Sequence, residues 1–229
     1  MSDLRGSVGI LGGSFNPVHN GHVRMAVEVR EALDLSRVDL VPAKVPPHKG
    51  TAGLLDFSLR LELLHLAVDG VQGIAVSGLE GELPVPSYSY STLEYLRRTR
   101  PGVNHVFIMG GGDFLTLPDW HRGLELPLLA DIVVVRREDV ALEAIDRFLD
   151  RYWQWSYEGH GGRRVAGGRR IFFLSIPRLD ISSSLVRDRF LACREVAGLV
   201  SEGERAALVR HGELCRRVWR TIRAGASSE

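Results

Sequence analysis

A short apolar run from Val8 to Leu11 leads into a glycine turn and then into two closely spaced histidines. The run predicts a buried strand, and the pair Gly12-Gly13 lets the backbone turn and approach a ligand closely, because glycine has no Cβ. His19 and His22 are separated by one helical turn, so both rings can face one point if a helix begins near Asn20. The positive N-terminus of such a helix favours an anion such as phosphate.

The alternative is an ordinary turn with two surface histidines. One observation argues against this alternative. The first junction between a predicted strand and a predicted helix contains the two glycines, the loop proline Pro17 and the H-x-G-H pattern together. Ligands of open α/β sheets bind at such junctions. We therefore interpret the stretch from Gly12 to His22 as a phosphate-binding turn.

Strand and helix patterns alternate along most of the chain. The first strand–helix–strand unit requires a parallel sheet with a right-handed crossover, so the sequence predicts an α/β fold. The predicted strands cover residues 8–11, 37–41, 74–76, 103–109, 131–135 and 171–176, and the predicted helices cover residues 21–33, 57–68, 92–99, 140–150 and 202–210.

We expect a single domain over residues 1–229, because neither repeats nor a linker interrupt the chain. Residues 152–170, rich in glycine and arginine, break the alternation and are interpreted as an irregular insertion. Whether that insertion is a lid or a subunit contact is left open, as is homo-oligomer formation. Residues 200–223 are expected to form a C-terminal helical extension, with Ser201 and Glu204 as a capping box.

The chain is 45% hydrophobic and 25% charged, with a net charge of +1. This balance argues against broad binding to nucleic acid or to an anionic membrane. Cys193 and Cys215 are too few for a zinc site or a disulfide framework. No signal core occurs, nor an apolar run of about 18 residues that could cross a membrane, so we expect a cytoplasmic protein with reduced thiols.

Lysine is almost absent from this chain. Of the 29 lysine and arginine residues, only Lys44 and Lys49 are lysines, and both lie in one short loop after the second predicted strand. A compact ammonium suits phosphate binding, with chance placement as the alternative.

A second informative stretch runs from Asp180 to Arg187 and contains three consecutive serines. One hydroxyl is enough to cap the helix that follows. The purely structural interpretation of this stretch is therefore a capped helix with an exposed arginine. The remaining hydroxyls, the free N–H groups and Arg187 together favour a second anion site.

The most apolar later strand ends in Gly110-Gly111-Gly112-Asp113. The glycines again allow close backbone approach, and Asp113 either bonds a ribose hydroxyl or caps the next helix. Trp120 either stacks on a flat heterocycle or belongs to the core.

The patterns of other enzyme classes are missing. There is no G-x-S-x-G elbow, no G-K-[ST] phosphate loop and no G-x-G-x-x-G after the first strand, which weakens hydrolase, ATPase and hydride-transfer interpretations. Direct transfer of a nucleotidyl group fits, because it depends on positioning and on donors that stabilise charge at phosphorus.

The motifs together resemble the nicotinate-nucleotide adenylyltransferase family, a branch of the HxGH nucleotidyltransferases. They are G-G-S-F-N-P-V-H-N-G-H, V-P-P-H-K, P-S-Y-S, a G-D turn followed by P-D-W, V-R-R and D-I-S-S-S-L-V-R, in family order across residues 7–190.

The resemblance implies a single nucleotidyltransferase domain with a Rossmann-like open, mainly parallel sheet and helices on both faces. It implies direct in-line transfer of AMP from ATP to nicotinate mononucleotide, giving deamido-NAD and pyrophosphate for NAD biosynthesis. Mg²⁺ would sit among phosphate oxygens and water, without protein ligands. The expected partners are ATP and nicotinate mononucleotide, with no nucleic acid and no membrane.

The resemblance also assigns roles to matching positions. The catalytic residues would be His19, His22, Lys44 and Arg187. The ATP-binding residues would be Gly12, Gly13, Ser14, Phe15, His19, His22, Gly110, Asp113, Ile181, Ser182, Ser183 and Arg187. The residues that bind the acceptor would be Lys44, His48, Lys49, Tyr88, Ser89, Trp120 and Arg136, with the Trp120 indole stacked on the pyridine ring.

Some positions depart from the family pattern. The G-x-D turn reads G-G-G-D here, and Ser89 and Ser184 stand where the family has threonine.

Two other functions remain open. The acceptor could be nicotinamide mononucleotide or another acceptor within the superfamily. The chain could also be a noncatalytic nucleotide sensor, which would have no need for the residues His19, His22, Lys44 and Arg187.

Overall fold

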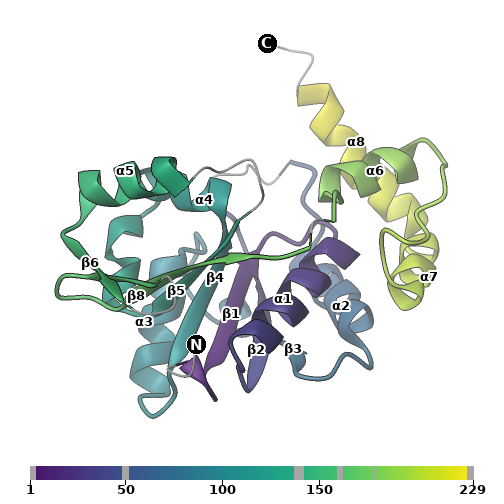
Figure 1. Ribbon diagram of the computed structural model, residues 1–229. Coiled ribbons are helices and arrows are strands. Elements are labelled where there is room, and N and C mark those ends of the chain that lie inside the picture. Colours follow the sequence, from purple (N-terminus) through teal and green to yellow (C-terminus); the bar gives the residue numbers. More distant parts are fainter. Residues whose placement is uncertain (1–3, 48–51, 137–141, 159–161, 178, 226–229) are drawn as a thin grey trace. The chain divides into compact units, whose positions relative to one another are not determined.

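The structure is a computed structural model, and it describes residues 4–47, 52–136, 142–158, 162–177 and 179–225. Strands and helices alternate along most of it (Figure 1), as the sequence predicts. The strands are β1 Val8–Gly13, β2 Arg37–Pro42, β3 Ile74–Val76, β4 His105–Gly110, β5 Asp131–Arg136, β6 Trp155–Glu158, β7 Gly162–Val165 and β8 Arg170–Ser175. The α-helices are α1 Asn20–Ala32, α2 Phe57–Val68, α3 Ser89–Thr99, α4 Gly111–Leu115, α5 Leu142–Tyr152, α6 Ser183–Leu191, α7 Glu202–Arg210 and α8 Gly212–Gly225.

One mixed sheet contains the described strands, in the order β3-β2-β1-β4-β5-β8-β7-β6. β4 is parallel to both β1 and β5, and β5 is parallel to β8. Their register places Ile10 beside Phe107, and Phe107 beside Ile132. These central strands are buried along nearly their whole length, which explains their unbroken valine, isoleucine and phenylalanine runs. The predicted α/β fold with a mainly parallel sheet is confirmed.

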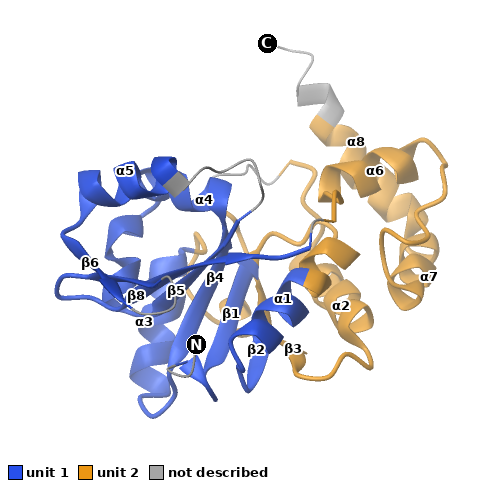
Figure 2. Ribbon diagram, viewed as in Figure 1, with its two compact units in different colours: residues 1–12, 25–39, 88–178 blue, residues 13–24, 40–87, 179–229 orange. Residues whose placement is uncertain are grey.

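The chain divides into two compact units (Figure 2). Unit 1 consists of residues 1–12, 25–39 and 88–178, and unit 2 consists of residues 13–24, 40–87 and 179–229. The predicted phosphate-binding stretches fall mainly in unit 2, and the predicted pyridine-binding residues fall mainly in unit 1. The expectation of a single domain over the whole chain stays a prediction.

An aromatic cluster holds α4 and α5 of unit 1 together. The Phe114 ring lies 4.9 Å from the Phe148 ring and 5.7 Å from the Phe173 ring, measured between centroids. Trp153 adds its ring to Phe148 and donates from Nε1 to the Leu124 carbonyl. Phe114 is completely buried, so this cluster anchors the short helix that follows the glycine turn of β4.

Residues 155–158 and 162–165 differ from the predicted irregular insertion. They form strands β6 and β7, which pair antiparallel with each other, and β7 pairs antiparallel with β8. Trp155 and Tyr157 lie on one face of β6, with ring centroids 4.8 Å apart. The Arg163 guanidinium lies 5.6 Å from the first ring and 4.9 Å from the second, so cation–π contacts stabilise the pair of strands. Residues 159–161 lie outside the described part of the chain.

Two helix starts also differ from the predictions. α3 begins at Ser89, earlier than the predicted Thr92, with Tyr88 as N-cap and no side-chain cap bond. α4 has Gly110 as N-cap, so the alternative of Asp113 as a helix cap is wrong. Because the helix starts directly after the strand, Asp113 lies inside its first turn, where the helix dipole favours a carboxylate.

The two cysteines are free thiols. Cys193 is exposed, whereas Cys215 is buried, and burial raises the pKa of its thiol to about 11. Among the described residues, no helix is both long enough and apolar enough to span a bilayer.

Candidate functional site

The glycine turn at the end of β1 is shaped around one phenylalanine. Phe15 is almost fully buried and has a φ of 44°, a left-handed conformation that is uncommon outside glycine. A Cβ added at Gly13 would lie 3.1 Å from the Phe15 ring, whereas a Cβ at Gly12 would lie 3.8 Å from its nearest neighbour. Gly13 is therefore needed for space, and Gly12 is not.

The two histidines of the turn lie against each other. The ring centroids of His19 and His22 are 3.7 Å apart, and the rings of Phe15 and His22 pack in a T-shaped arrangement with centroids 4.9 Å apart. His19 directly precedes α1, and its carbonyl accepts from the His22 N–H at 2.9 Å. The spacing predicted that both rings could face one point at the helix start, and the structure brings them together there.

The serine stretch joins this turn within unit 2. Ser182 caps α6, because its hydroxyl accepts from the Leu185 N–H at 3.1 Å. The Ser183 hydroxyl donates to the Pro17 carbonyl at 2.7 Å. One serine therefore caps the helix, as expected, and its neighbour contacts the glycine turn, whereas the predicted anion binding by this stretch stays a prediction.

Arg187 makes a second link between the two stretches. Its Nη1 donates to the Asn16 carbonyl at 2.8 Å, and its Nη2 donates to the Ser184 hydroxyl at 2.9 Å. Burial lowers the pKa of Arg187, and the nearby Asp188 raises it by less. Ile181 also lies close by, because its carbonyl is 3.6 Å from where a Gly21 Cβ would stand.

The lysine loop lies beside the glycine turn, as expected if β1 and β2 are neighbours. The Ala43 N–H donates to the Gly13 carbonyl at 2.9 Å. Lys44 donates from Nζ to the Gly81 carbonyl at 2.7 Å. The Ser87 hydroxyl accepts from the N–H groups of Lys44 and Val45, which fixes the loop backbone. The other two predicted residues of this loop, His48 and Lys49, lie outside the described residues.

Arg60 of α2 is a buried residue that the sequence analysis did not identify. Its side chain is fully buried, and Nη1 donates to the carbonyls of Ser14 and Ala43 at 2.8 and 2.7 Å. Nε and Nη2 donate to the carbonyls of Leu55 and Lys44. Arg60 thus ties the glycine turn to the lysine loop.

Burial lowers the pKa of Arg60 to about 10, against the opposing effect of nearby carboxylates. The guanidinium remains charged near neutral pH. A signal for this residue exists in the sequence, because Arg60 lies on the face of α2 that also carries Leu59, Leu63 and Leu64. A lone arginine on an apolar helix face is a candidate for buried carbonyl contacts.

Most of the predicted residues of unit 1 lie in two segments, the one that follows β4 and the one at the start of α3. Asp113 is exposed in the first turn of α4, and its Oδ2 is 3.5 Å from where a Gly110 Cβ would stand. Trp120 is half-buried and donates from Nε1 to the Thr116 hydroxyl at 3.2 Å. The Tyr88 ring stacks on His121, with centroids 4.2 Å apart.

Ser89 and Arg136 complete the unit 1 set. Ser89 is the first residue of α3, and Arg136 is the last residue of β5, at the same strand end as the glycine turn of β4.

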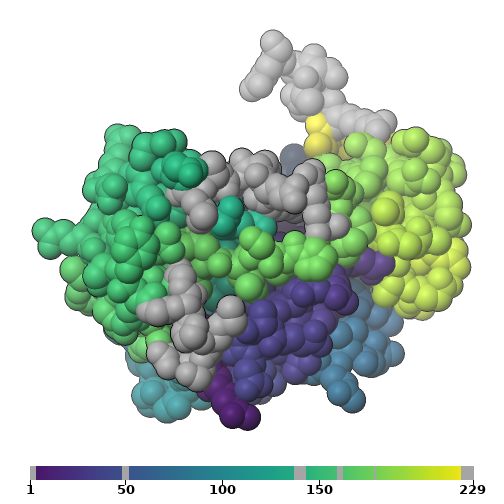
Figure 3. Space-filling view, in the orientation of Figure 1, coloured from purple at the N-terminus to yellow at the C-terminus, as the bar shows by residue number. Residues whose placement is uncertain are grey.

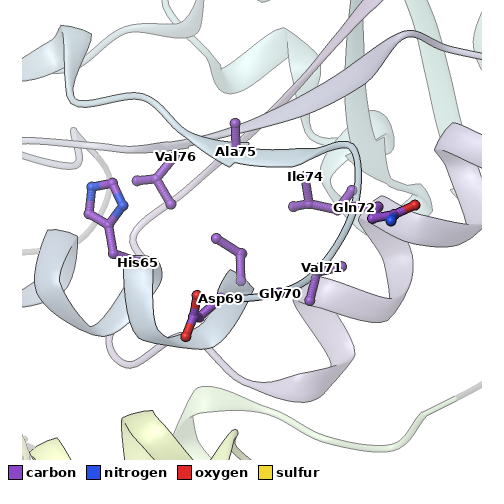
Figure 4. A pocket seen from close by; sticks show the side chains of 9 residues that line it. His65, Asp69, Gly70, Val71, Gln72, Ile74, Ala75 and Val76 are labelled. Carbon is purple, nitrogen blue, oxygen red and sulfur yellow. The ribbon is translucent and has the colours of Figure 1, made fainter.

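A pocket of about 700 Å³ lies elsewhere in unit 2, between the end of α2 and β3 (Figure 4). His65, Asp69 and Val76 are among the residues that line it, and none of the predicted site residues does. Within the described ranges, no group of three or more histidine, cysteine or acidic residues could hold a metal ion. The residues predicted to bind phosphate are glycine, serine, histidine, lysine and arginine, whose backbone and side-chain donors suit an anion.

Comparisons with known proteins agree on one family. The cytidylyltransferase-like family profile matches residues 10–189. A protein of Geotalea daltonii named "Probable nicotinate-nucleotide adenylyltransferase" is 38% identical over 187 residues, covering 79% of this chain and 85% of the relative. A protein of the same name from Streptococcus pyogenes is 35% identical, covering 80% of this chain and 77% of the relative.

Solved structures share the fold. Plasmodium falciparum nicotinic acid mononucleotide adenylyltransferase complexed with NaAD matches with a TM-score of 0.70 at 16% identity, covering 90% of this chain and 96% of that one. The same enzyme complexed with APC matches with a TM-score of 0.67 at 15% identity, covering 91% and 96%. These matches identify the fold as Rossmann-like.

Proposed function

The chain belongs to the nicotinate-nucleotide adenylyltransferase family, and we propose that it transfers AMP from ATP to nicotinate mononucleotide, giving deamido-NAD and pyrophosphate. One observation supports this function most. Ser183 and Arg187 of the serine stretch bond the backbone of the glycine turn that carries His19 and His22, so the two motifs predicted to bind anions contact each other within unit 2.

The reaction is a direct displacement at phosphorus. A phosphate oxygen of nicotinate mononucleotide attacks the α-phosphorus of ATP and forms the new P–O bond. The bond from that phosphorus to the α,β-bridging oxygen breaks, and its electron pair leaves with pyrophosphate. Negative charge grows on the bridging and non-bridging oxygens, so catalysis requires fixed donors around them.

We assign those donors to unit 2. His19 and His22 would contact the phosphates at the start of α1, beside Gly12, Gly13, Ser14 and Phe15. Arg187 would hold the β- and γ-phosphates together with the stretch Ile181 to Ser183. Lys44 would add a charge from the neighbouring loop, and His48 and Lys49 remain candidates from the sequence alone.

The acceptor half of the proposal concerns unit 1. The Trp120 indole would stack on the pyridine ring, and the backbone around Tyr88 and Ser89 would meet its carboxylate. Gly110 and Asp113 would contact the nucleoside of ATP, and Arg136 would add a positive charge near the acceptor. The exposed position of Asp113 inside the first turn of α4 is compatible with a bond to a ribose hydroxyl.

Mg²⁺ would be held by the phosphate oxygens and water. The donor set of unit 2 fits this arrangement, because it consists of cationic and neutral groups in place of carboxylate ligands. When bound, the ion neutralises phosphate charge. The cytoplasmic location expected from the sequence stays a prediction.

The test is pyrophosphate release by the full chain with ATP, Mg²⁺ and nicotinate mononucleotide, with deamido-NAD identified by chromatography. We expect clearly slower turnover with nicotinamide mononucleotide. Equal or faster turnover with the amide would overturn the acid preference. ATP binding without release on either nucleotide would instead support a noncatalytic sensor.

A further inference from the structure

The C-terminal helix α8 lies beyond the family match, which ends at residue 189. Even so, one of its side chains reaches the glycine turn. Trp219 is almost fully buried, and its Nε1 donates to the Asn16 side-chain oxygen at 3.3 Å. Both residues belong to unit 2.

The Asn16 side chain is the centre of a small network. Its Oδ1 accepts from the Leu55 N–H at 3.1 Å as well as from Trp219, and its Nδ2 donates to the Gly53 carbonyl at 2.7 Å. Two donors face the oxygen and one acceptor faces the nitrogen, so only one orientation of this amide satisfies all three partners. Trp219 therefore helps to fix how Asn16 is held.

The backbone of the same residue holds the phosphate-binding arginine. The Asn16 carbonyl accepts from Arg187 Nη1 at 2.8 Å, and the next carbonyl, that of Pro17, accepts from Ser183. A shift of Asn16 would therefore move the acceptor that aims the guanidinium. This gives a continuous chain of contacts from the α8 indole to Arg187.

Packing holds the indole in this position. The Trp219 ring meets Phe190 of α6 edge to face, with centroids 5.5 Å apart. One turn along α8, Ile222 contacts Gly53 so closely that a Cβ there would overlap it, and Gly53 has a φ of +73°. Helices α6, α7 and α8 form a continuous surface, coloured green to yellow in Figure 3. Helix α8 thus contacts Asn16 through Trp219, and it contacts Gly53, which accepts a hydrogen bond from Asn16, through Ile222.

We propose that Trp219 is a positioning residue for ATP binding: its indole N–H fixes Asn16, and Asn16 in turn aims Arg187 at the polyphosphate. This rests on the proposed adenylyl transfer for the identity of the nucleotide. It gives α8, outside the matched family region, a part in the site.

The test variant is Trp219→Phe, which removes the N–H donor and keeps an aromatic ring against Phe190. The matched control is Cys215→Ala, which removes a fully buried side chain of the same helix and leaves the Trp219–Asn16 bond in place. Calorimetric titration of each full chain with ATP and Mg²⁺, without acceptor, gives the Kd. Steady-state rates then give the KM of each substrate, and urea unfolding reports stability.

For Trp219→Phe, we expect ATP affinity to fall about threefold to tenfold, the effect of one lost hydrogen bond. The KM for ATP should rise while that for nicotinate mononucleotide stays unchanged. Cys215→Ala should lower stability and leave the ATP Kd unchanged.

An ATP Kd of Trp219→Phe equal to that of the wild type would overturn the proposal. Equal weakening in both variants would also overturn it, because the effect would then follow helix packing. If the wild type binds ATP and Trp219→Phe binds it more weakly, yet neither releases pyrophosphate, the positioning role stands and the proposed transfer fails.

Discussion

Arg187 donates from Nη1 to the carbonyl oxygen of Asn16 across 2.8 Å, and this bond joins residues that are 171 positions apart in the chain. The second nitrogen, Nη2, is held by Ser184. A planar guanidinium fixed at two nitrogens has one orientation, which a flexible ammonium cannot reproduce. These two bonds therefore orient the Arg187 guanidinium, which suits its proposed role in phosphate binding.

Replacing Arg187 by lysine keeps the positive charge and removes the planar guanidinium that donates from two nitrogens. We expect Arg187→Lys to lower kcat/KM for ATP by about 10²-fold, comparable to the loss of one transition-state donor. The measurement is the initial rate of pyrophosphate release at varied ATP. Arg189→Lys is the matched control, because Arg189 lies on the same helix and donates to the Glu195 carbonyl. A loss of similar size in the control would remove the special role of Arg187.

The histidine pair gives a second prediction. His22→Ala should lower kcat by at least about 10²-fold, because the variant lacks one donor to the charge that develops on phosphate. His65→Ala, an exposed histidine of α2, should leave kcat unchanged. Single-turnover rates with saturating ATP separate the chemical step from product release. An unchanged kcat in His22→Ala would take His22 out of the chemistry.

The two glycines of the turn should respond differently to the same added methyl group. Gly13→Ala places a Cβ 3.1 Å from the buried Phe15 ring, so we expect the free energy of unfolding to fall by about 1–3 kcal/mol from overpacking. Gly12→Ala meets only ordinary contact at 3.8 Å and should change it by less than about 1 kcal/mol. Urea unfolding without nucleotide measures both. Equal losses would mean that Phe15 does not set the space at Gly13.

A buried carboxyl makes stability depend on pH. Burial raises the pKa of Glu204 in α7 well above its ordinary value of 4.5, and the Ser201 backbone N–H lowers it by less. Above pH 4.5 the unfolded chain loses this proton while the folded chain keeps it, so stability falls as pH rises toward the folded pKa. Glu204→Gln removes this loss. We therefore expect the variant to gain stability relative to the wild type between pH 5 and pH 8, as measured by urea unfolding.

Glu202 of the same helix is the control for that experiment. Its carboxylate bonds Arg205, which lowers its pKa, so its stabilising contribution is present above its ordinary pKa and is lost as pH falls through the folded value. The stability difference between Glu202→Gln and the wild type should thus be the same at pH 5 and at pH 8. A constant difference for Glu204→Gln as well would show that its carboxyl is ionised in the fold.

The sequence predicted those helices whose ends are marked by residues close to them in the chain. Helix α2 runs over Phe57–Val68 and α7 over Glu202–Arg210, as predicted, because Asp56 and Asp69-Gly70 mark the ends of the first and a capping serine marks the start of the second. The Ser201 hydroxyl accepts from the Glu204 N–H at 3.1 Å. The two stretches proposed to bind phosphate were recognisable as a turn and a helix start for the same reason, since short-range spacing determines both.

The partners of contacts between residues distant in sequence were not predictable. The apolar face of α2 marks Arg60 as a candidate for buried contacts, but only the folded chain shows its four backbone acceptors. Trp219 lies in an arginine-rich tail, and its partner Asn16 is 203 positions away. Strands β6 and β7 were not predicted, because the many glycines and arginines of this segment suggested a loop. The spacing of Trp155 and Tyr157, which are two residues apart, is the strand signal that was missed.

The two units are interleaved along the chain, since each is assembled from three separate segments. No single cut can release either one whole: residues 88–178, for example, lack the strand β1 beside which β4 pairs. A fragment that carries the proposed acceptor residues of segment 88–178 therefore has to regain β1 before its sheet is complete. Cutting the chain into two consecutive pieces would separate strands that pair with each other, so neither compact unit can be prepared as a simple truncation.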